Sequence, residues 1–296
     1  DIFICPNCGN EIVFWDAAVD EENKKVKDVF QCDNCRIELK KTDCERATEL
    51  VYDDGIKETI SMAKQVPVLI NYSVGDKRYE KKPDKEDLEI IKKINNTKIP
   101  YWYPTDELPE GYNTEQPKRS HGITHVHHFY TRRNLFALSY IFKFIKDNAF
   151  LKFIFTSINP RLVTKMSVYR VGRGKSNLTS GTLYVPSFNS DYNVIETYRS
   201  KFKTILNALS KLKYNVEDKI ISTCSTTDIS GLDDNTIDYI FTDPPFGSNL
   251  NYSELNFIWE AWLKVFTNNK PEAIINKVQN KGLVEYQELM TKCFKE

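Results

Sequence analysis

The tetrapeptide Asp243-Pro244-Pro245-Phe246 places an acid, a proline carbonyl and an aromatic ring next to one another. It follows the apolar run at residues 237–241, which is predicted to be a buried strand. Each proline fixes φ and removes a backbone donor, so the loop after this strand is stiff. Because ligands bind at the carboxyl ends of strands in open α/β sheets, we expect the loop to present its groups to a ligand. The alternative is a strand-to-turn junction with an incidental pair of prolines.

Two Cys-x-x-Cys pairs near the start of the chain could bind a metal ion. The four thiols are Cys5, Cys8, Cys32 and Cys35. This spacing is typical of a structural zinc site in which each pair supplies two ligands of a tetrahedron, and the runs at residues 12–15 and 26–30 are predicted to form the arms of a small ribbon. Disulfides or a redox dithiol are the alternatives, but paired knuckles in a chain without secretory features favour Zn²⁺. Cys44 is expected to lie outside the site.

The tetrapeptide resembles the Asp-Pro-Pro-Tyr/Phe signature of S-adenosylmethionine-dependent amino methyltransferases, which modify exocyclic amines of nucleobases. The resemblance implies that Asp243, Pro244, Pro245 and Phe246 are catalytic. In such chemistry the Asp243 carboxylate and the Pro244 carbonyl accept the hydrogens of the amine, and Phe246 stacks on a base that has left the duplex. The methyl group passes in line from a sulfonium, so that catalysis rests on positioning and electrostatics. Asp243 is also expected to contact S-adenosylmethionine.

Residues on either side of the tetrapeptide are further candidates. In the resembled family a polar or acidic residue after the preceding strand contacts the cofactor adenine, and Asp228 is the candidate here, although a capping role explains it as well. Asn249 and Tyr252 lie in the connection to the next helix, where they could line the target pocket or serve as plain turn residues. Ser253 is predicted to cap that helix.

A wider resemblance rests on the segment from His125 to Leu138, on residues 180–186 and on Asn193-Val194. Together with the two end motifs, these segments resemble the large bacterial and phage DNA methylases that carry a zinc ribbon and act on adenine. The resemblance covers nearly the whole chain. It implies an α/β fold containing part of a Rossmann-like methyltransferase sheet, with an N-terminal zinc ribbon and an inserted α+β region. The implied domains are the ribbon at residues 1–45, a target-recognition region at 46–118 and an incomplete catalytic region at 119–296. It also implies methylation of adenine N6 in DNA, in a restriction-modification setting, with S-adenosylmethionine and structural Zn²⁺.

One expected motif is missing. In that family a glycine-rich cofactor loop precedes the ribbon, whereas the only close Gly-x-Gly here is Gly172-Arg173-Gly174-Lys175, whose charges suit a phosphate contact or a plain surface loop. We therefore expect this chain to be a piece of a longer methyltransferase, with the missing N-terminal half as a candidate partner. Two other functions stay open. One is methylation of RNA, because guanine-N2 enzymes for tRNA also use Asp-Pro-Pro-aromatic-Gly; the other is nucleic-acid binding by a zinc-ribbon fragment without catalysis.

The charge balance restricts how nucleic acid could be bound. The 296 residues contain 41 Lys and Arg against 41 Asp and Glu, so no global positive field exists and DNA binding must rest on local patches. The densest positive charge in predicted loops and at a helix start is the best candidate for phosphate contacts, although solvated surface charge is the alternative. These residues are Lys118, Arg119, Arg132, Arg133, Arg170, Arg173 and Lys175. The lack of an apolar run of membrane-spanning length and of a signal peptide, together with the cysteine usage, predicts a cytoplasmic protein without a membrane partner.

All four histidines fall between residues 121 and 128. Because no carboxylate or cysteine sits at ligand spacing among them, packing, a substrate or backbone contact, and a metal site all remain open. The helix predicted to follow begins at Thr131-Arg132-Arg133-Asn134, where its amides and two arginines could bind an anion. A second amphipathic helix is predicted over residues 195–212, and a strand over residues 66–72.

Overall fold

The computed structural model describes residues 1–159, 162–172, 179, 181–212, 221, 224–248 and 250–296. Over these residues the protein combines helices with small sheets, and every strand pair is antiparallel. The fold is therefore mixed α and β, as expected, but a parallel Rossmann-like sheet is not part of what these residues show. The segment at 237–241 was predicted to be a buried strand, but its residues are exposed and it does not pair as a strand with any described residue. The strand predicted at 219–223 lies almost entirely outside the described residues.

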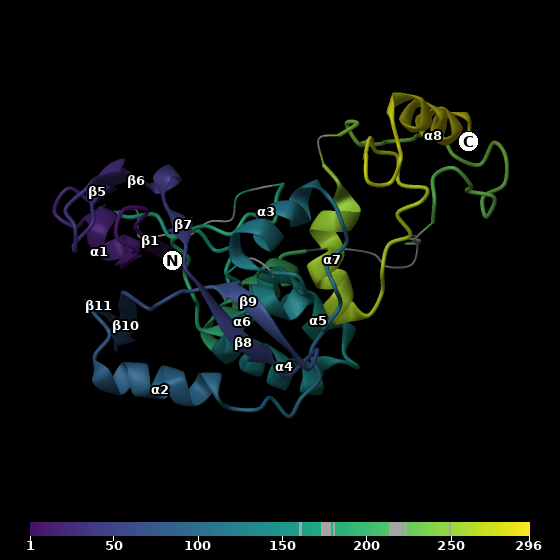
Figure 1. Ribbon diagram of the computed structural model, residues 1–296. Helices are drawn as coiled ribbons and strands as arrows, with labels where there is room; N and C mark the ends of the chain where they lie inside the picture. The colour runs from purple at the N-terminus through teal and green to yellow at the C-terminus, as the bar shows by residue number, and fades with distance from the viewer. Residues whose placement is uncertain (160–161, 173–178, 180, 213–220, 222–223, 249) are drawn as a thin grey trace.

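The N-terminal region is a ribbon of short hairpins, drawn in purple in Figure 1. Its core consists of apolar side chains that alternate with exposed ones along the short strands, as in Phe30 and Leu39, which pair across two strands and are both 3% exposed. Phe14 and Phe3 complete this core with an edge-to-face contact. The elements are β1 (Ile2–Ile4), β2 (Glu11–Val13), α1 (Phe14–Ala18), β3 (Val19–Asp20), β4 (Lys25–Val26), β5 (Val29–Gln31), β6 (Glu38–Lys40), η1 (Lys41–Asp43) and β7 (Glu45–Arg46).

The ribbon is attached to the rest of the molecule by backbone pairing and by stacked rings. The amide of Ile2 donates to Lys64 O at 3.0 Å, and the amide of Ala47 donates to Ile2 O at 3.0 Å. Phe188, from a distant part of the chain, stacks on Phe14 with ring centroids 4.9 Å apart. The ribbon and the segment around residue 188 therefore share a core.

Two hairpins and a helix follow the ribbon. They are β8 (Thr48–Asp53) with β9 (Glu58–Ala63), β10 (Ile70–Val74) with β11 (Lys77–Lys81), and α2 (Lys85–Asn95). The strand predicted at residues 66–72 overlaps β10 only over Ile70–Tyr72, because residues 66–69 are not in a strand. Helix α2 is capped by Asp84, whose side chain accepts from the amide of Asp87.

Most of the remaining helices pack around a hydrophobic core, whereas α8 (Leu283–Lys295) lies apart from it and has no buried residue (Figure 1). The others are α3 (Tyr112–His121), η2 (Val126–Phe129), α4 (Arg132–Ile145), α5 (Ala149–Ile158), α6 (Val194–Leu209) and α7 (Tyr252–Leu263). Thr131 caps α4 by accepting from the amide of Asn134, and Asn193 caps α6, so both predicted helices are found close to their expected bounds. Helix α3 runs through residue 118, where a domain boundary was expected.

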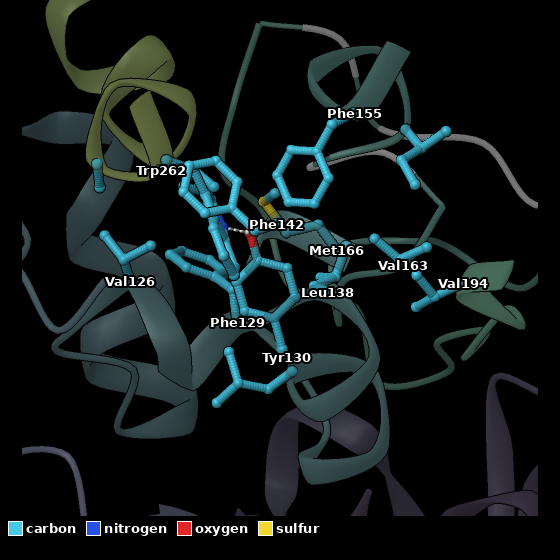
Figure 2. Packing of buried hydrophobic residues seen from close by; sticks show 14 of the residues in the cluster. Val126, Phe129, Tyr130, Leu138, Phe142, Phe155, Val163, Met166, Val194 and Trp262 are labelled. Atoms are coloured by element: carbon cyan, nitrogen blue, oxygen red, sulfur yellow. Dashed lines mark hydrogen bonds between the residues drawn. The ribbon is translucent and has the colours of Figure 1, made fainter. Parts of the chain in front are cut away.

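Trp262 of α7 is the centre of this core. Figure 2 shows it packed among Phe142, Phe155 and Tyr130, and its Nε1 donates to the Tyr130 hydroxyl at 2.9 Å. The hydroxyl in turn donates to Asn159. A buried tryptophan N–H with a partner fixes the orientation of the ring, so α7 is held firmly against α4 and α5. In the chain, α7 comes after the candidate catalytic loop at residues 243–246.

Candidate metal centre and candidate catalytic loop

The two cysteine pairs adopt the same turn. In the first, Cys5 N donates to Asn10 O at 2.9 Å and Gly9 N donates to Cys5 O at 2.9 Å. In the second, Cys32 N donates to Ile37 O at 3.0 Å and Arg36 N donates to Cys32 O at 2.9 Å. The residue after each pair has a positive φ, 71° at Gly9 and 62° at Arg36. Each turn directs both of its thiols to the same side, as a metal-binding knuckle requires.

The thiols converge with the geometry of a tetrahedral site. Their sulfur atoms all lie within 4.8 Å of one another, and the Cys5–Cys35 and Cys8–Cys32 separations are both 3.7 Å. Zn–S bonds of about 2.3 Å place the corners of a tetrahedron roughly 3.8 Å apart, so the donor set and its spacing fit Zn²⁺. The predicted four-cysteine cluster, able to hold a metal ion, is confirmed. Cys44 is not part of this cluster, and its thiol donates to Lys40 O at 3.8 Å.

Each knuckle contributes an asparagine that acts on the opposite knuckle. A hydrogen bond from the Asn34 side chain lowers the pKa of the Cys8 thiol, and one from the Asn7 side chain lowers the pKa of Cys35 to about 6. Burial raises the pKa of Cys5 to about 11. Asn7 and Asn34 occupy equivalent positions in the two pairs, a signal that the sequence contained and that spacing alone did not single out. Such outer partners orient and stabilise thiolate ligands.

The Asp243-Pro244-Pro245-Phe246 loop lies at the surface. Asp243 is exposed, and the Phe246 side chain is 72% exposed. Two bonds from the C-terminal segments hold the loop: the Tyr286 hydroxyl donates to Pro245 O at 2.8 Å, and Ile275 N donates to Gly247 O at 3.2 Å. Gly247 has φ of 55°, which turns the chain towards α7. The loop is thus held by its second proline and its glycine, while the acid and the ring project from it.

The other predicted contacts around this loop are placed as follows. Asp228 is exposed and its Oδ1 accepts from the amide of Ser230 at 3.2 Å, a contact within a turn and not the helix cap that was the alternative. Tyr252 begins α7 and is 46% exposed. Ser253 does not cap α7, because the helix begins one residue earlier with Asn251 before it; instead its amide and hydroxyl donate to Glu272. Asn249 lies outside the described residues.

The predicted phosphate contacts form several ion pairs within the chain. Arg132 donates to Asp54 Oδ2 at 2.7 Å and to Thr97 O at 3.0 Å, and Arg133 pairs with Asp191 at 2.8 Å. Neither guanidinium therefore points freely at an anion at the start of α4. Lys118 pairs with Glu110, whereas Arg119 and Arg170 are exposed. Arg173 and Lys175 lie outside the described residues.

Two of the four histidines, His127 and His128, contact a carboxylate that the sequence did not reveal, whereas His121 bonds to Ser120 and Asp1. Asp53, at the end of β8, accepts from His127 Nε2 at 2.7 Å and from His128 Nε2 at 2.6 Å, and all three side chains are buried. The Nδ1 atom of His128 accepts from the amides of Thr124 and His125, which fixes the Nε2–H tautomer. Ligands of one tetrahedral metal would lie roughly 3.3 Å apart with Nε2 unprotonated. This cluster can bring three ligand atoms together, but it fits a hydrogen-bonded triad better than a metal site.

Burial and hydrogen bonding set the charge states of this triad. Burial lowers the pKa of His128 to about 4, only partly opposed by its bond to Asp53. Burial alone would raise the pKa of Asp53, but the hydrogen bonds from the two imidazoles outweigh it and hold that pKa well below its usual range. The triad consequently joins the β8–β9 hairpin to η2 as a carboxylate with two imidazole donors. Asp53 could not be found from sequence because it lies far from the histidines along the chain.

Comparison of the chain with models of protein families, with curated proteins and with solved structures gives no match. Among the described residues, no helix combines the length and apolar character needed to cross a membrane.

Proposed function

We propose that this chain belongs to an S-adenosylmethionine-dependent DNA methyltransferase that modifies an exocyclic base amine, most consistent with adenine N6. The observation that supports this most is the surface loop in which Asp243 and Phe246 project while Pro245 and Gly247 are tied to the C-terminal segments. An acid and a free aromatic face, side by side on a stiff loop, are what an extruded base with an amino group requires. The zinc-binding cluster at the other end of the chain is compatible with a nucleic-acid-binding ribbon.

The loop residues have distinct roles in this proposal. The Asp243 carboxylate and the Pro244 carbonyl accept the two amine hydrogens, which draws the nitrogen lone pair out of conjugation with the ring. Phe246 stacks on the base and fixes its plane. As the nitrogen takes up the methyl group it becomes positively charged, and the Asp243 carboxylate stabilises that charge and can receive the departing proton. S-adenosylmethionine, when bound, supplies the methyl group from its sulfonium.

The exposed apolar segment before the loop, residues 237–241, supports the rest of the proposed architecture. The apolar side chains of this segment are between 54% and 82% exposed, although a short apolar run of this kind is typical of a buried strand; they are Ile237, Tyr239, Ile240 and Phe241. Apolar side chains of this kind are buried when strands pair on both sides, as in a parallel sheet covered by helices. We propose that the segment joins a Rossmann-like sheet together with the half of the enzyme that carries the glycine-rich loop.

The experiment compares Asp243→Ala with Asp238→Ala, a matched change in the same segment, in the longer protein that carries both halves. We expect Asp243→Ala to reduce methyl transfer to adenine-containing duplex DNA by about 10²- to 10³-fold, as when one preorganised polar partner of a reacting group is removed. Binding of DNA and S-adenosylmethionine should be nearly unchanged. More than about a tenth of the normal rate in Asp243→Ala would show that the loop is structural. Competition between duplex DNA and tRNA as substrates then separates DNA from RNA methylation.

A further inference from the structure

A cavity of about 330 Å³ lies beside α7, where residues 109–110 and the chain after the helix approach it. Helix α7 ends at Leu263 and is followed by Lys264, whose left-handed φ of 58° turns the chain back along the helix (Figure 1). This return brings Phe266 onto Phe257, with ring centroids 5.1 Å apart and planes inclined by 36°. The two rings form an aromatic wall of the cavity.

The charged side chains that line this cavity are acidic, and Glu110 is paired with Lys118 just outside the lining. Glu110, Glu254 and Glu260 line it, and none of the described residues that line it is basic. Glu254 is 2% exposed, and the donors to its carboxylate among the described residues are all amide groups, namely Asn113 N at 2.9 Å, Asn113 Nδ2 at 3.0 Å and Asn276 Nδ2 at 3.1 Å. These donors are neutral, and none of the ion pairs among the described residues involves Glu254. A buried anion of this kind favours a cation close by.

A further acceptor in the same wall has no partner. The Oε1 atom of Gln279 is buried and makes no hydrogen bond, and Gln279 lines the cavity. Buried side-chain oxygens are nearly always hydrogen-bonded, so an unpaired one indicates a position where a donor or a positive charge is accommodated. Glu260, in contrast, is held in place by the amide and hydroxyl of Thr267.

The shape and chemistry of the cavity select among cations. A single metal ion is much smaller than the cavity, and the Glu254 oxygens that would bind it already accept amide hydrogens. An onium centre with apolar substituents suits the site better, because aromatic faces attract such cations and carboxylates complement their charge without direct coordination. We infer that this cavity binds the charged centre of a small organic onium ion, either a sulfonium or a substituted ammonium. If the proposed function holds, on which this last step rests, the sulfonium of the methyl donor is the occupant.

The test uses the whole chain and tetramethylammonium as a bare onium probe, followed by proton NMR of its methyl groups. Binding beside Phe257 and Phe266 should shift these signals upfield through the ring currents. Phe257→Leu keeps an apolar side chain but removes the aromatic face, and should weaken binding about 5- to 30-fold. Gln279→Glu adds a carboxylate of the same shape and should strengthen binding several-fold. Phe153→Leu, at an exposed position on α5, is the matched control and should leave binding unchanged.

The outcomes separate the cavity from the methyltransferase function. The inference is overturned if tetramethylammonium does not bind, or if neither Phe257→Leu nor Gln279→Glu alters its binding. If Phe257→Leu unfolds, Gln279→Glu, which should strengthen binding, still decides the test. The same variants are then titrated with S-adenosylmethionine and with S-adenosylhomocysteine, which lacks the sulfonium charge. The methyl donor is identified as the occupant if S-adenosylmethionine binds more tightly than S-adenosylhomocysteine and its affinity changes across the variants in the same direction as that of tetramethylammonium. Probe binding without any affinity for S-adenosylmethionine supports the cation site and counts against the donor.

Discussion

Removal of one zinc ligand should unfold the ribbon selectively, and Cys8→Ser is the most informative change. Cys8 is exposed, whereas Cys5 and Cys32 are buried, so replacing the Cys8 sulfur leaves no cavity and acts only through the metal. Cys44→Ser is the matched control, because Cys44 belongs to the same region but not to the cluster.

The size of the effect follows from what else holds the ribbon together. Its apolar core has few large side chains, and Phe3, Ile12, Phe14, Phe30 and Leu39 contribute about 2 kcal/mol each, or roughly 10 kcal/mol together. Structural zinc contributes about 10–16 kcal/mol in small zinc-binding domains, at least as much as that core. A typical domain has only about 5–15 kcal/mol of net stability, so the ribbon cannot remain folded after this loss.

The assay combines zinc quantification with hydrogen exchange read by mass spectrometry. We expect the Cys44→Ser protein to retain one equivalent of zinc, and the Cys8→Ser protein to lose it. In Cys8→Ser the amides of residues 1–46 should exchange rapidly while those of α4 and α5 stay protected. The segment around Phe188 should also lose protection, because its ring stacks on Phe14 of the ribbon. Equal zinc content and equal protection in the two variants, or natively purified protein without zinc, would refute the reasoning.

Three further outcomes are expected. Asn7→Ala combined with Asn34→Ala should weaken zinc affinity by about 10- to 100-fold without unfolding the metal-loaded protein, because the hydrogen bonds to Cys35 and Cys8 are lost. Competition with a chelating dye measures this affinity. An unchanged affinity would show that these hydrogen bonds do not support the ligands. Burial holds the folded-state pKa of His128 at about 4, below an unfolded value of about 6.5, so its contribution to stability is complete above pH 6.5 and is lost as the pH falls towards 4. Over this range we expect the free energy of unfolding to decrease by about 3 kcal/mol, measured as loss of hydrogen-exchange protection in β8–β9. The His128→Asn protein should not show this decrease. Replacing Arg170, Arg173 and Lys175 with alanine should weaken binding to all DNA sequences alike and reduce the salt dependence of log K by up to about three, and an unaltered slope would place the DNA path elsewhere.

The sequence alone identified the parts of this protein whose chemistry depends on local spacing. The four-cysteine cluster that could hold a metal ion could be predicted because the two residues between the cysteines of a pair allow both thiols to lie on the same side of one turn. The helices at residues 132–145 and 194–209 were predictable for a similar reason, since their apolar periodicity and their Thr131 and Asn193 caps lie within a few residues of one another.

What only the tertiary structure decided involves residues that are distant in the chain. Arg132 and Arg133 were expected to face an anion, yet Asp54 and Asp191 neutralise them, and neither carboxylate lies near them in sequence. Asp53 joins His127 and His128 in the same way, which turns a run of histidines of uncertain role into a buried triad. The carboxylate-lined cavity beside α7 likewise combines residues 110, 254 and 279, which no local pattern connects. The sequence shows which side chains are charged, but packing of the whole chain determines the ion-pair partner of each one.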